Sequence, residues 1–226
     1  MIIAITNGKG GVGKSTIAVH LAAWLHQQGH NVILADCDSQ QSSSEWIREA
    51  VPEITTVRFD KPAMILNELQ ELAKDADFVI ADGPGSQAET TLALLLRSDF
   101  AIVPCKASML EVRALAKATE SLRHAKGLRH GVPKAVTVLS MVGKNYRLTN
   151  DMKETAAALK LPLASTPMTL RQVYADAPGQ GKVVWQLGAR AREAAEETTR
   201  LFREIFPQVA AKATKVTRLK RTAAKR

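Results

Sequence analysis

The 226-residue sequence has few aromatic residues and cysteines and no long apolar segment. Aromatic residues make up only 4% of the chain against 46% hydrophobic residues, which favours helices packed on a buried parallel sheet over a β-sandwich. Cys37 and Cys105 form neither a disulfide framework nor a C-x-x-C site, which predicts a reducing compartment. No apolar run reaches transmembrane length, and residues 1–6 lack the basic flank of a signal peptide. We therefore expect a soluble, cytoplasmic protein that does not associate with membranes.

Acidic residues are absent from the end of the chain, which holds most of the excess positive charge. The formal net charge is +9, and subtracting the seven basic residues of the segment 207–226 leaves +2 for residues 1–206. We predict a folded domain over 1–206 and a basic, flexible tail over 207–226, which is typical of a nucleic-acid contact. A disordered extension that only aids solubility is the alternative. The predicted DNA-binding residues of the tail are Lys212, Lys215, Arg218, Lys220 and Arg221.

Short apolar runs alternate with helical patterns along residues 1–206, as expected of βα units. Strand patterns cover residues 2–5, 31–36, 54–59, 77–82, 100–105, 133–142 and 163–166. A first helical pattern opens at Ser15 and stops at Gly29, and further ones cover residues 40–50, 62–74, 87–97, 109–125, 150–160 and 188–206. We predict a single doubly wound, mostly parallel α/β sheet with helices on both faces. In such sheets ligands bind at the carboxyl ends of the strands.

Residues 8–15 match the phosphate-loop pattern G-x-x-x-x-G-K-[ST] between the first strand pattern and the first helix. Glycines let the backbone turn its N–H groups toward an anion, and the helix N-terminus adds partial positive charge. Lys14 would reach the β- and γ-phosphates of ATP, and Ser15 would ligate Mg²⁺. A surface loop that matches by chance is the alternative, which the flanking strand and helix disfavour. The predicted nucleotide-binding residues here are Gly8, Lys9, Gly10, Gly11, Val12, Gly13, Lys14, Ser15 and Thr16.

A second lysine in this loop, Lys9, gives the sequence Lys-Gly-Gly-Val-Gly-Lys-Ser-Thr, which resembles the deviant Walker A loop of the ParA/MinD ATPases. The resemblance implies a P-loop NTPase fold and slow, partner-stimulated hydrolysis of ATP. It also implies that Lys9 crosses the interface of an ATP-bound homodimer and neutralises charge on the phosphoryl group held by the partner subunit. Lys9 and Lys14 are thus predicted catalytic residues, with a solvated surface charge as the alternative for Lys9.

Two acidic motifs follow strand patterns. The sequence Asp-Cys-Asp-Ser-Gln at residues 36–40 resembles the family's D-x-D-P-Q switch I, with serine in place of proline. The resemblance implies that Asp38 positions the attacking water and that Asp36 supports the Mg²⁺ shell. Turn-forming, helix-capping aspartates are the alternative. Residues 79–85 have the form of a Walker B strand and switch II, in which Asp82 would hold Mg²⁺ through water, with a βα turn capped by an aspartate as the alternative.

Later segments resemble the short plasmid-partition ATPases more closely than MinD. These are residues 100–105 and the sequence Thr-Leu-Arg-Gln-Val-Tyr at residues 169–174. Adenine contacts in the family come from segments after the late strands, so Met141 and Pro167 are candidates, with core and turn roles as alternatives. Arg171 is a candidate DNA contact, and a solvated role is its alternative.

The chain begins at the first strand, so we expect no N-terminal helix-turn-helix and only non-specific DNA binding. The resemblance implies a nucleoid-associated ParA-type ATPase whose ATP-bound homodimer binds DNA and positions a plasmid or chromosome locus. Its partner would be a ParB-like protein or another small activator or cargo adaptor. One alternative is the same ATPase chemistry serving a protein cargo, such as a carboxysome or chemosensory cluster. A MinD-like membrane ATPase, which needs an amphipathic C-terminal helix, and a binding module without turnover are the others.

Overall fold

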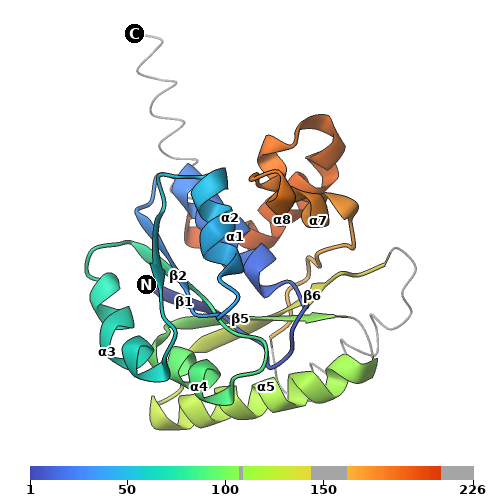
Figure 1. Ribbon diagram of the computed structural model, residues 1–226. Helices are drawn as coiled ribbons and strands as arrows, with labels where there is room; N and C mark the ends of the chain where they lie inside the picture. Colours follow the sequence, from blue (N-terminus) through green and yellow to red (C-terminus); the bar gives the residue numbers. More distant parts are fainter. Residues whose placement is uncertain (107–108, 144–161, 210–226) are drawn as a thin grey trace.

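Six parallel strands form one sheet in the computed structural model, which describes residues 1–106, 109–143 and 162–209 (Figure 1). The strand order is β3-β2-β4-β1-β5-β6. The strands are β1 (Ile2–Ile5), β2 (Val32–Asp36), β3 (Thr55–Arg58), β4 (Phe78–Asp82), β5 (Phe100–Lys106) and β6 (Lys134–Ser140). This confirms the predicted doubly wound α/β class, and the central strand β1 lies between β4 and β5.

Helices cover both faces of the sheet (Figure 1). The α-helices are α1 (Lys14–Gln27), α2 (Ser42–Ala50), α3 (Pro62–Leu72), α4 (Ala88–Arg97), α5 (Met109–Leu128), α7 (Gln172–Gly179) and α8 (Arg192–Ile205). Two 3₁₀ turns are η1 (Val184–Gln186) and η2 (Gly188–Ala191). Among the helices of the described segments, none combines the length and apolarity needed to span a bilayer.

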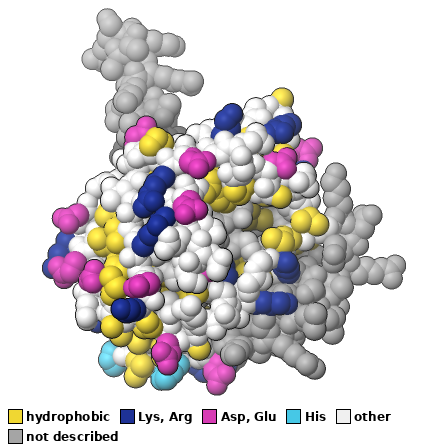
Figure 2. Space-filling model, viewed as in Figure 1, with side chains coloured by type: hydrophobic (Ala, Val, Ile, Leu, Met, Phe, Trp, Pro, Cys, Tyr) yellow, Lys and Arg dark blue, Asp and Glu magenta, His cyan; other side chains and the backbone are white. Residues whose placement is uncertain are grey.

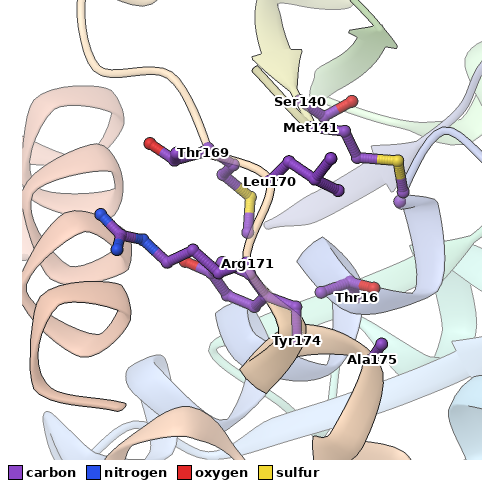
Figure 3. Close-up of a pocket in the computed structure, with 10 residues that line it drawn as sticks. Thr16, Ser140, Met141, Thr169, Leu170, Arg171, Tyr174 and Ala175 are labelled. Atoms are coloured by element: carbon purple, nitrogen blue, oxygen red, sulfur yellow. The ribbon is translucent and has the colours of Figure 1, made fainter. Parts of the chain in front are cut away.

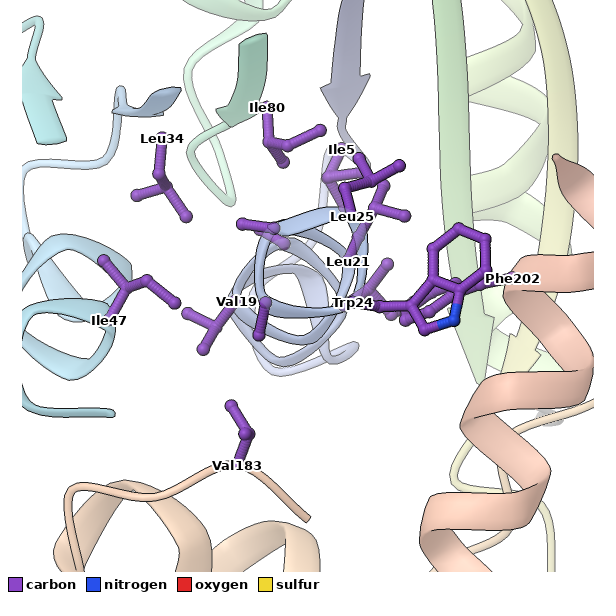
Figure 4. Close-up of a cluster of buried hydrophobic side chains, with 14 of the residues drawn as sticks. Ile5, Val19, Leu21, Trp24, Leu25, Leu34, Ile47, Ile80, Val183 and Phe202 are labelled. Carbon is purple, nitrogen blue, oxygen red and sulfur yellow. The ribbon is translucent and has the colours of Figure 1, made fainter. Parts of the chain in front are cut away.

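The two faces of β1 belong to different hydrophobic clusters. Ile3 and Ile5 pack with α1, α2 and α8, whereas Ile2 and Ala4 pack on the side of α3 and α4, as the alternation of side chains along a strand requires. Figure 4 shows α1 at the centre of the first cluster, with Ile47 of α2 on one side and Phe202 of α8 on the other. Residues 17–25 of α1 are all buried. The helix that follows the phosphate loop is therefore fixed by packing on every side.

Several predicted boundaries differ from the structure. The strand predicted at 133–142 ends at Ser140, because Met141 has a φ of 53° and leaves the extended conformation. The strand predicted at 163–166 is reduced to an isolated bridge between Leu163 and Thr137. The helix predicted at 188–206 begins as a 3₁₀ turn and becomes α-helical at Arg192. The helix predicted at 150–160 lies outside the described residues, and sequence reasoning missed α7 and η1.

The end of the described chain packs against the main core. Phe206 and Val209 are 1% and 2% exposed and belong to the same cluster as α1 and α8. The predicted boundary between domain and tail at residue 207 stays a prediction, because residues 210–226 lie outside the described segments.

Candidate functional site

The predicted phosphate loop connects β1 to α1 at the carboxyl edge of the sheet. Gly11 and Gly13 have φ values of +68° and +88°, a conformation that glycine adopts at no steric cost. The Lys14 side chain turns back over the loop and donates a hydrogen bond from Nζ to the Lys9 carbonyl at 2.9 Å. Burial lowers the pKa of Lys14, and the charges of Asp82 and Asp38 act against this shift. The structure thus brings the predicted loop lysine and two predicted carboxylates together.

Two side chains from outside the motif hold the loop to the neighbouring strands. Asn7 Nδ2 donates to the carbonyl of Pro104 on β5 at 2.6 Å. Ser140 Oγ, at the end of β6, donates to the carbonyl of Val12 at 2.8 Å. Both contacts join residues about a hundred positions apart along the chain, so sequence reasoning had no local signal for either one. They fix the loop at its entry and at its last turn.

Asp82 ends β4 with its carboxylate fully buried. It lies opposite Ile5 and Asp36 in the strand pairing. Neither carboxylate oxygen accepts a hydrogen bond of ordinary geometry from another described residue. Burial raises the pKa of Asp82 to about 7 and the charge of Asp36 adds to this, while the Ser15 and Ser43 hydroxyls and Lys14 oppose it. The hydroxyls lie near enough to act on the charge but form no hydrogen bond of ordinary geometry, so the buried carboxylate still needs a cation or a proton.

The predicted magnesium ligands fit such a cation in part. The orphaned oxygens of Asp82, beside the Ser15 hydroxyl, are the hard oxygen donors that Mg²⁺ prefers. In the described part of the chain, no group of three or more His, Cys, Asp or Glu residues is arranged to hold a metal alone. A Mg²⁺ ion at Ser15 and Asp82 would take its other ligands from water and nucleotide phosphates, and the metal role of both residues stays a prediction.

Asp36 and Asp38 form a turn after β2. The oxygens of Asp36 accept hydrogen bonds from the Asp38 and Ser44 backbone N–H groups, at 3.1 and 2.8 Å. Asp38 Oδ1 accepts one from the Gln40 N–H at 3.1 Å. These contacts are those of turn-forming aspartates, with Asp36 also bound to the first turn of α2. The water-positioning role of Asp38 and the Mg²⁺ role of Asp36 stay predictions.

The segment after β4, predicted as switch II, rests directly on the phosphate loop. A Cβ on Gly85 would lie 3.0 Å from both the N and the Cα of Gly10. A Cβ on Gly83 would lie 3.1 Å from the Ile5 carbonyl oxygen. A side chain at either position would force the neighbouring backbone to shift by a few tenths of an ångström. The segment after Asp82 and the phosphate loop are therefore packed backbone against backbone.

A pocket of about 160 Å³ opens beside the first turn of α1 (Figure 3). Its lining includes Gly13 and Thr16 from the loop and helix, and Met141, Met168 and Tyr174 from later segments. Met141, a predicted adenine contact, is among the lining residues. Pro167 is not, although the residue after it is. An apolar slot next to a phosphate loop suits the flat ring of a nucleotide base.

Glu197 of α8 is a buried carboxylate that contacts residues lining this pocket. Glu197 is 5% exposed and accepts hydrogen bonds from Thr169 N and Oγ1, at 2.8 and 2.5 Å. Arg171 lies 3.7 Å from Glu197 and 2.6 Å from Glu193. The Tyr174 hydroxyl bonds to Thr198 Oγ1 at 2.8 Å. The positive charge of Arg171 is therefore balanced within the chain, and its contact with DNA stays a prediction.

His20 of α1 connects the phosphate-loop helix to the segment before α8. Its Nδ1 lies 2.7 Å from the Thr16 carbonyl, and its Nε2 accepts the Val184 N–H at 3.2 Å. These partners require a neutral ring that carries its proton on Nδ1. Burial lowers the pKa of His20 to about 4. The rings of Trp46 and Trp185 lie edge-on or tilted against it, with centroids 5.3 and 5.6 Å away.

The predicted DNA-binding residues of the tail lie outside the described residues. These are Lys212, Lys215, Arg218, Lys220 and Arg221. On the face in Figure 2, basic and acidic side chains of the described residues are interspersed. This face therefore shows no large field of one sign, and DNA binding by the tail stays a prediction.

Comparisons with known proteins agree with this geometry. The family model of the CobQ/CobB/MinD/ParA nucleotide binding domain matches residues 3–184. Maintenance of carboxysome distribution protein A from Halothiobacillus neapolitanus is 32% identical, over 91% of this chain and 96% of that protein. The chromosome-partitioning ATPase Soj of Thermus thermophilus is 25% identical, over 92% and 96%. The ATP complex of Cyanothece McdA has a TM-score of 0.72 at 16% identity, over 90% and 95% of the two chains.

Proposed function

The chain belongs to the CobQ/CobB/MinD/ParA nucleotide-binding family, and from that premise we propose that it is a partner-stimulated ATPase that dimerises on ATP and binds DNA non-specifically. The observation that carries the proposal is the buried Asp82 carboxylate, whose oxygens accept no hydrogen bond of ordinary geometry from the described residues, beside the buried Lys14 at the phosphate loop. Both groups are stabilised when a metal-bound polyphosphate fills the loop.

Different residues of the chain are proposed to bind the nucleotide, hold the metal and support hydrolysis. Lys14 and the loop N–H groups would hold the phosphates, while Ser15 and Asp82 would hold Mg²⁺, which would supply positive charge to neutralise the phosphate oxygens. Asp38 orients water from its partly exposed position near Lys14. Lys9 acts in trans, in the nucleotide site of a second copy of the chain.

Replacing each lysine separately tests these roles. Lys14→Ala is expected to abolish binding of ATP, measured by isothermal titration calorimetry with Mg²⁺. Lys9→Ala is expected to bind ATP but to lose dimerisation, measured by sedimentation velocity, or ATP hydrolysis, measured by phosphate release. If Lys9→Ala kept full dimerisation and turnover, the role in trans would be wrong. If the wild-type protein stayed a monomer in saturating MgATP, the proposed dimer would be wrong.

The basic tail is the proposed DNA contact. One flexible tail binds weakly at physiological salt, and two tails on one dimer raise the effective concentration of the second contact. Deleting residues 210–226, which keeps the buried Val209, is expected to reduce retention on DNA in ATP and to flatten its salt dependence. Arg171→Ala serves as the comparison on the folded body. Unchanged retention after the deletion would move the contact to that body.

For the cargo, we propose a large protein assembly of the carboxysome kind. The support is the relative from Halothiobacillus neapolitanus, whose likeness extends over nearly the whole of both chains. A plasmid or chromosome locus is the second candidate, supported by the likeness to Soj. Deletion of the gene separates them: clustered protein bodies in the deletion strain favour the first, and loss of an unselected plasmid favours the second. The proposed location is the nucleoid, and liposome co-sedimentation tests the membrane alternative.

A further inference from the structure

A lysine outside the motifs, Lys106, lies beside the phosphate loop. The loop leaves β1 between β4 and β5, and these two strands place different groups next to it. Strand β4 ends at Asp82, opposite Ile5. Strand β5 pairs Ile102 with Ile5 and then continues to Lys106. At about 3.3 Å per residue, β5 extends roughly 13 Å beyond the end of β1, along the side of the loop.

The position of Lys106 is fixed by the same contacts that hold the loop. Lys106 pairs with Ser140 on β6, and Ser140 bonds to the Val12 carbonyl of the loop. Two residues before Lys106, the Pro104 carbonyl accepts the Asn7 hydrogen bond. The end of β5 and the loop therefore form one hydrogen-bonded unit.

The ammonium group of Lys106 points at the loop backbone. Its Nζ lies 3.9 Å from the position that a Cβ on Gly11 would take. The Lys106 side chain is half-buried, and within the described segments it forms no ion pair with a carboxylate. A lysine held beside the phosphate loop without a carboxylate partner adds positive charge to a site that attracts anions.

We propose that Lys106 is a further nucleotide-binding residue, whose ammonium group contacts the polyphosphate held in the loop of its own subunit. The inference rests on the proposed function and adds a cation that the phosphate-loop pattern does not contain. Lys106 differs from Lys9 in acting in cis, so its contribution is present in a monomer. It differs from Lys14 in reaching the loop from β5, outside the buried interior.

The expected loss of nucleotide affinity on removing the Lys106 charge is modest, because the Lys106 side chain is partly exposed to solvent. A cation about 4 Å from a phosphate contributes little at the dielectric constant of water and more near a protein surface, so we expect a loss of affinity of about fivefold to tenfold when the charge is removed. Salt screens exposed charges with a Debye length of about 10 Å at 0.1 M. The loss is therefore expected to shrink as sodium chloride is raised.

The test compares Lys106→Gln, Lys106→Arg and a control, Lys134→Gln, in the full-length protein. Lys134 is an exposed lysine that pairs with Phe100 at the opposite end of the same two strands. Affinity for a fluorescent ATP analogue and its ADP form is measured with Mg²⁺, at protein concentrations where sedimentation shows a monomer. Thermal unfolding without nucleotide checks that each variant folds.

The expected result is weaker binding in Lys106→Gln alone, with Lys106→Arg within about twofold of wild type because the charge is kept. Binding in Lys106→Gln within twofold of a wild type that binds well would overturn the inference and leave the proposed function intact. Failure of the wild type to bind MgATP would overturn both. If Lys106→Gln unfolds at a lower temperature than wild type, Lys106→Arg becomes the deciding variant. Wild-type affinity of Lys106→Arg for the nucleotide supports a role for the positive charge, and a loss of affinity equal to that of Lys106→Gln refutes it.

Discussion

Replacing Asp82 with asparagine should stabilise the nucleotide-free protein while removing its response to MgATP. The Asp82 carboxylate is fully buried, and neither oxygen accepts a hydrogen bond of ordinary geometry from the described residues, although the Ser15 and Ser43 hydroxyls lie nearby. Asparagine has nearly the same shape without the charge. The wild-type protein thus keeps an unfavourable buried charge that a bound cation would compensate, and the variant does not.

The expected gain in stability of Asp82→Asn and its pH dependence follow from the pKa of the Asp82 carboxyl group. The pKa of Asp82 rises from 3.8 to about 7, because burial disfavours the charged form. Between these values the folded state keeps a proton that the unfolded state has lost, so stability falls as pH rises toward 7 and is level above it. Roughly three pKa units at 1.36 kcal/mol each give a cost of about 4 kcal/mol at pH 8. The buried asparagine amide would also lack hydrogen-bond partners, which costs about 1–3 kcal/mol, so we expect Asp82→Asn to raise the free energy of unfolding by about 2 kcal/mol.

The assay is urea unfolding at 25 °C, followed by circular dichroism in EDTA without nucleotide, at pH 8 and at pH 4.5. The difference between Asp82→Asn and wild type should favour the variant at pH 8 and vanish or reverse at pH 4.5. The exposed Asp75→Asn is the control, expected to change stability by less than about 0.5 kcal/mol at either pH. With MgATP at a hundred times its dissociation constant, wild type should gain about 2.7 kcal/mol and the variant almost nothing. Equal destabilisation of Asp82→Asn at both pH values would refute the reasoning.

Three further predictions follow from other contacts. Gly85→Ala should reduce ATP turnover and cost about 1–3 kcal/mol, because its Cβ would meet the phosphate-loop backbone at 3.0 Å, whereas Gly179→Ala, in open space, should do neither. His20→Ala should cost about 3 kcal/mol in urea unfolding at pH 7.5. The pKa of His20 is lowered from 6.5 to about 4, so the folded state binds the proton at a lower pH than the unfolded state. The free energy of unfolding of the wild type should therefore fall as pH drops from 6.5 to 4. His20→Ala should lack this pH-dependent loss of stability. Glu197→Ala should lower the free energy of unfolding by about 3 kcal/mol and weaken ATP affinity, since it leaves Thr169 and Arg171 without their buried carboxylate partner. Unaltered ATP affinity would show that the pocket residues bound to Glu197 are not part of the nucleotide site.

The sequence predicted the elements whose signals are local. The phosphate loop could be identified because glycines, lysine and serine occupy fixed offsets between an apolar run and a helical pattern. Asp82 was predicted at a strand end for the same reason, and the structure places it next to Lys14. The parallel sheet followed from the alternation of apolar runs and helical patterns. Boundaries failed where one residue changed the backbone, as at Met141.

The tertiary structure decided what surrounds the loop. Asn7, Ser140 and Lys106 carry no motif, and they matter because the sheet order places the ends of β5 and β6 beside a loop about a hundred residues earlier in the chain. Arg171, a candidate for DNA, forms ion pairs with two glutamates of a helix that begins some twenty residues later. Local sequence fixes turn chemistry and periodicity, whereas the neighbours of a side chain depend on how distant segments pack, and that information is spread over the whole chain.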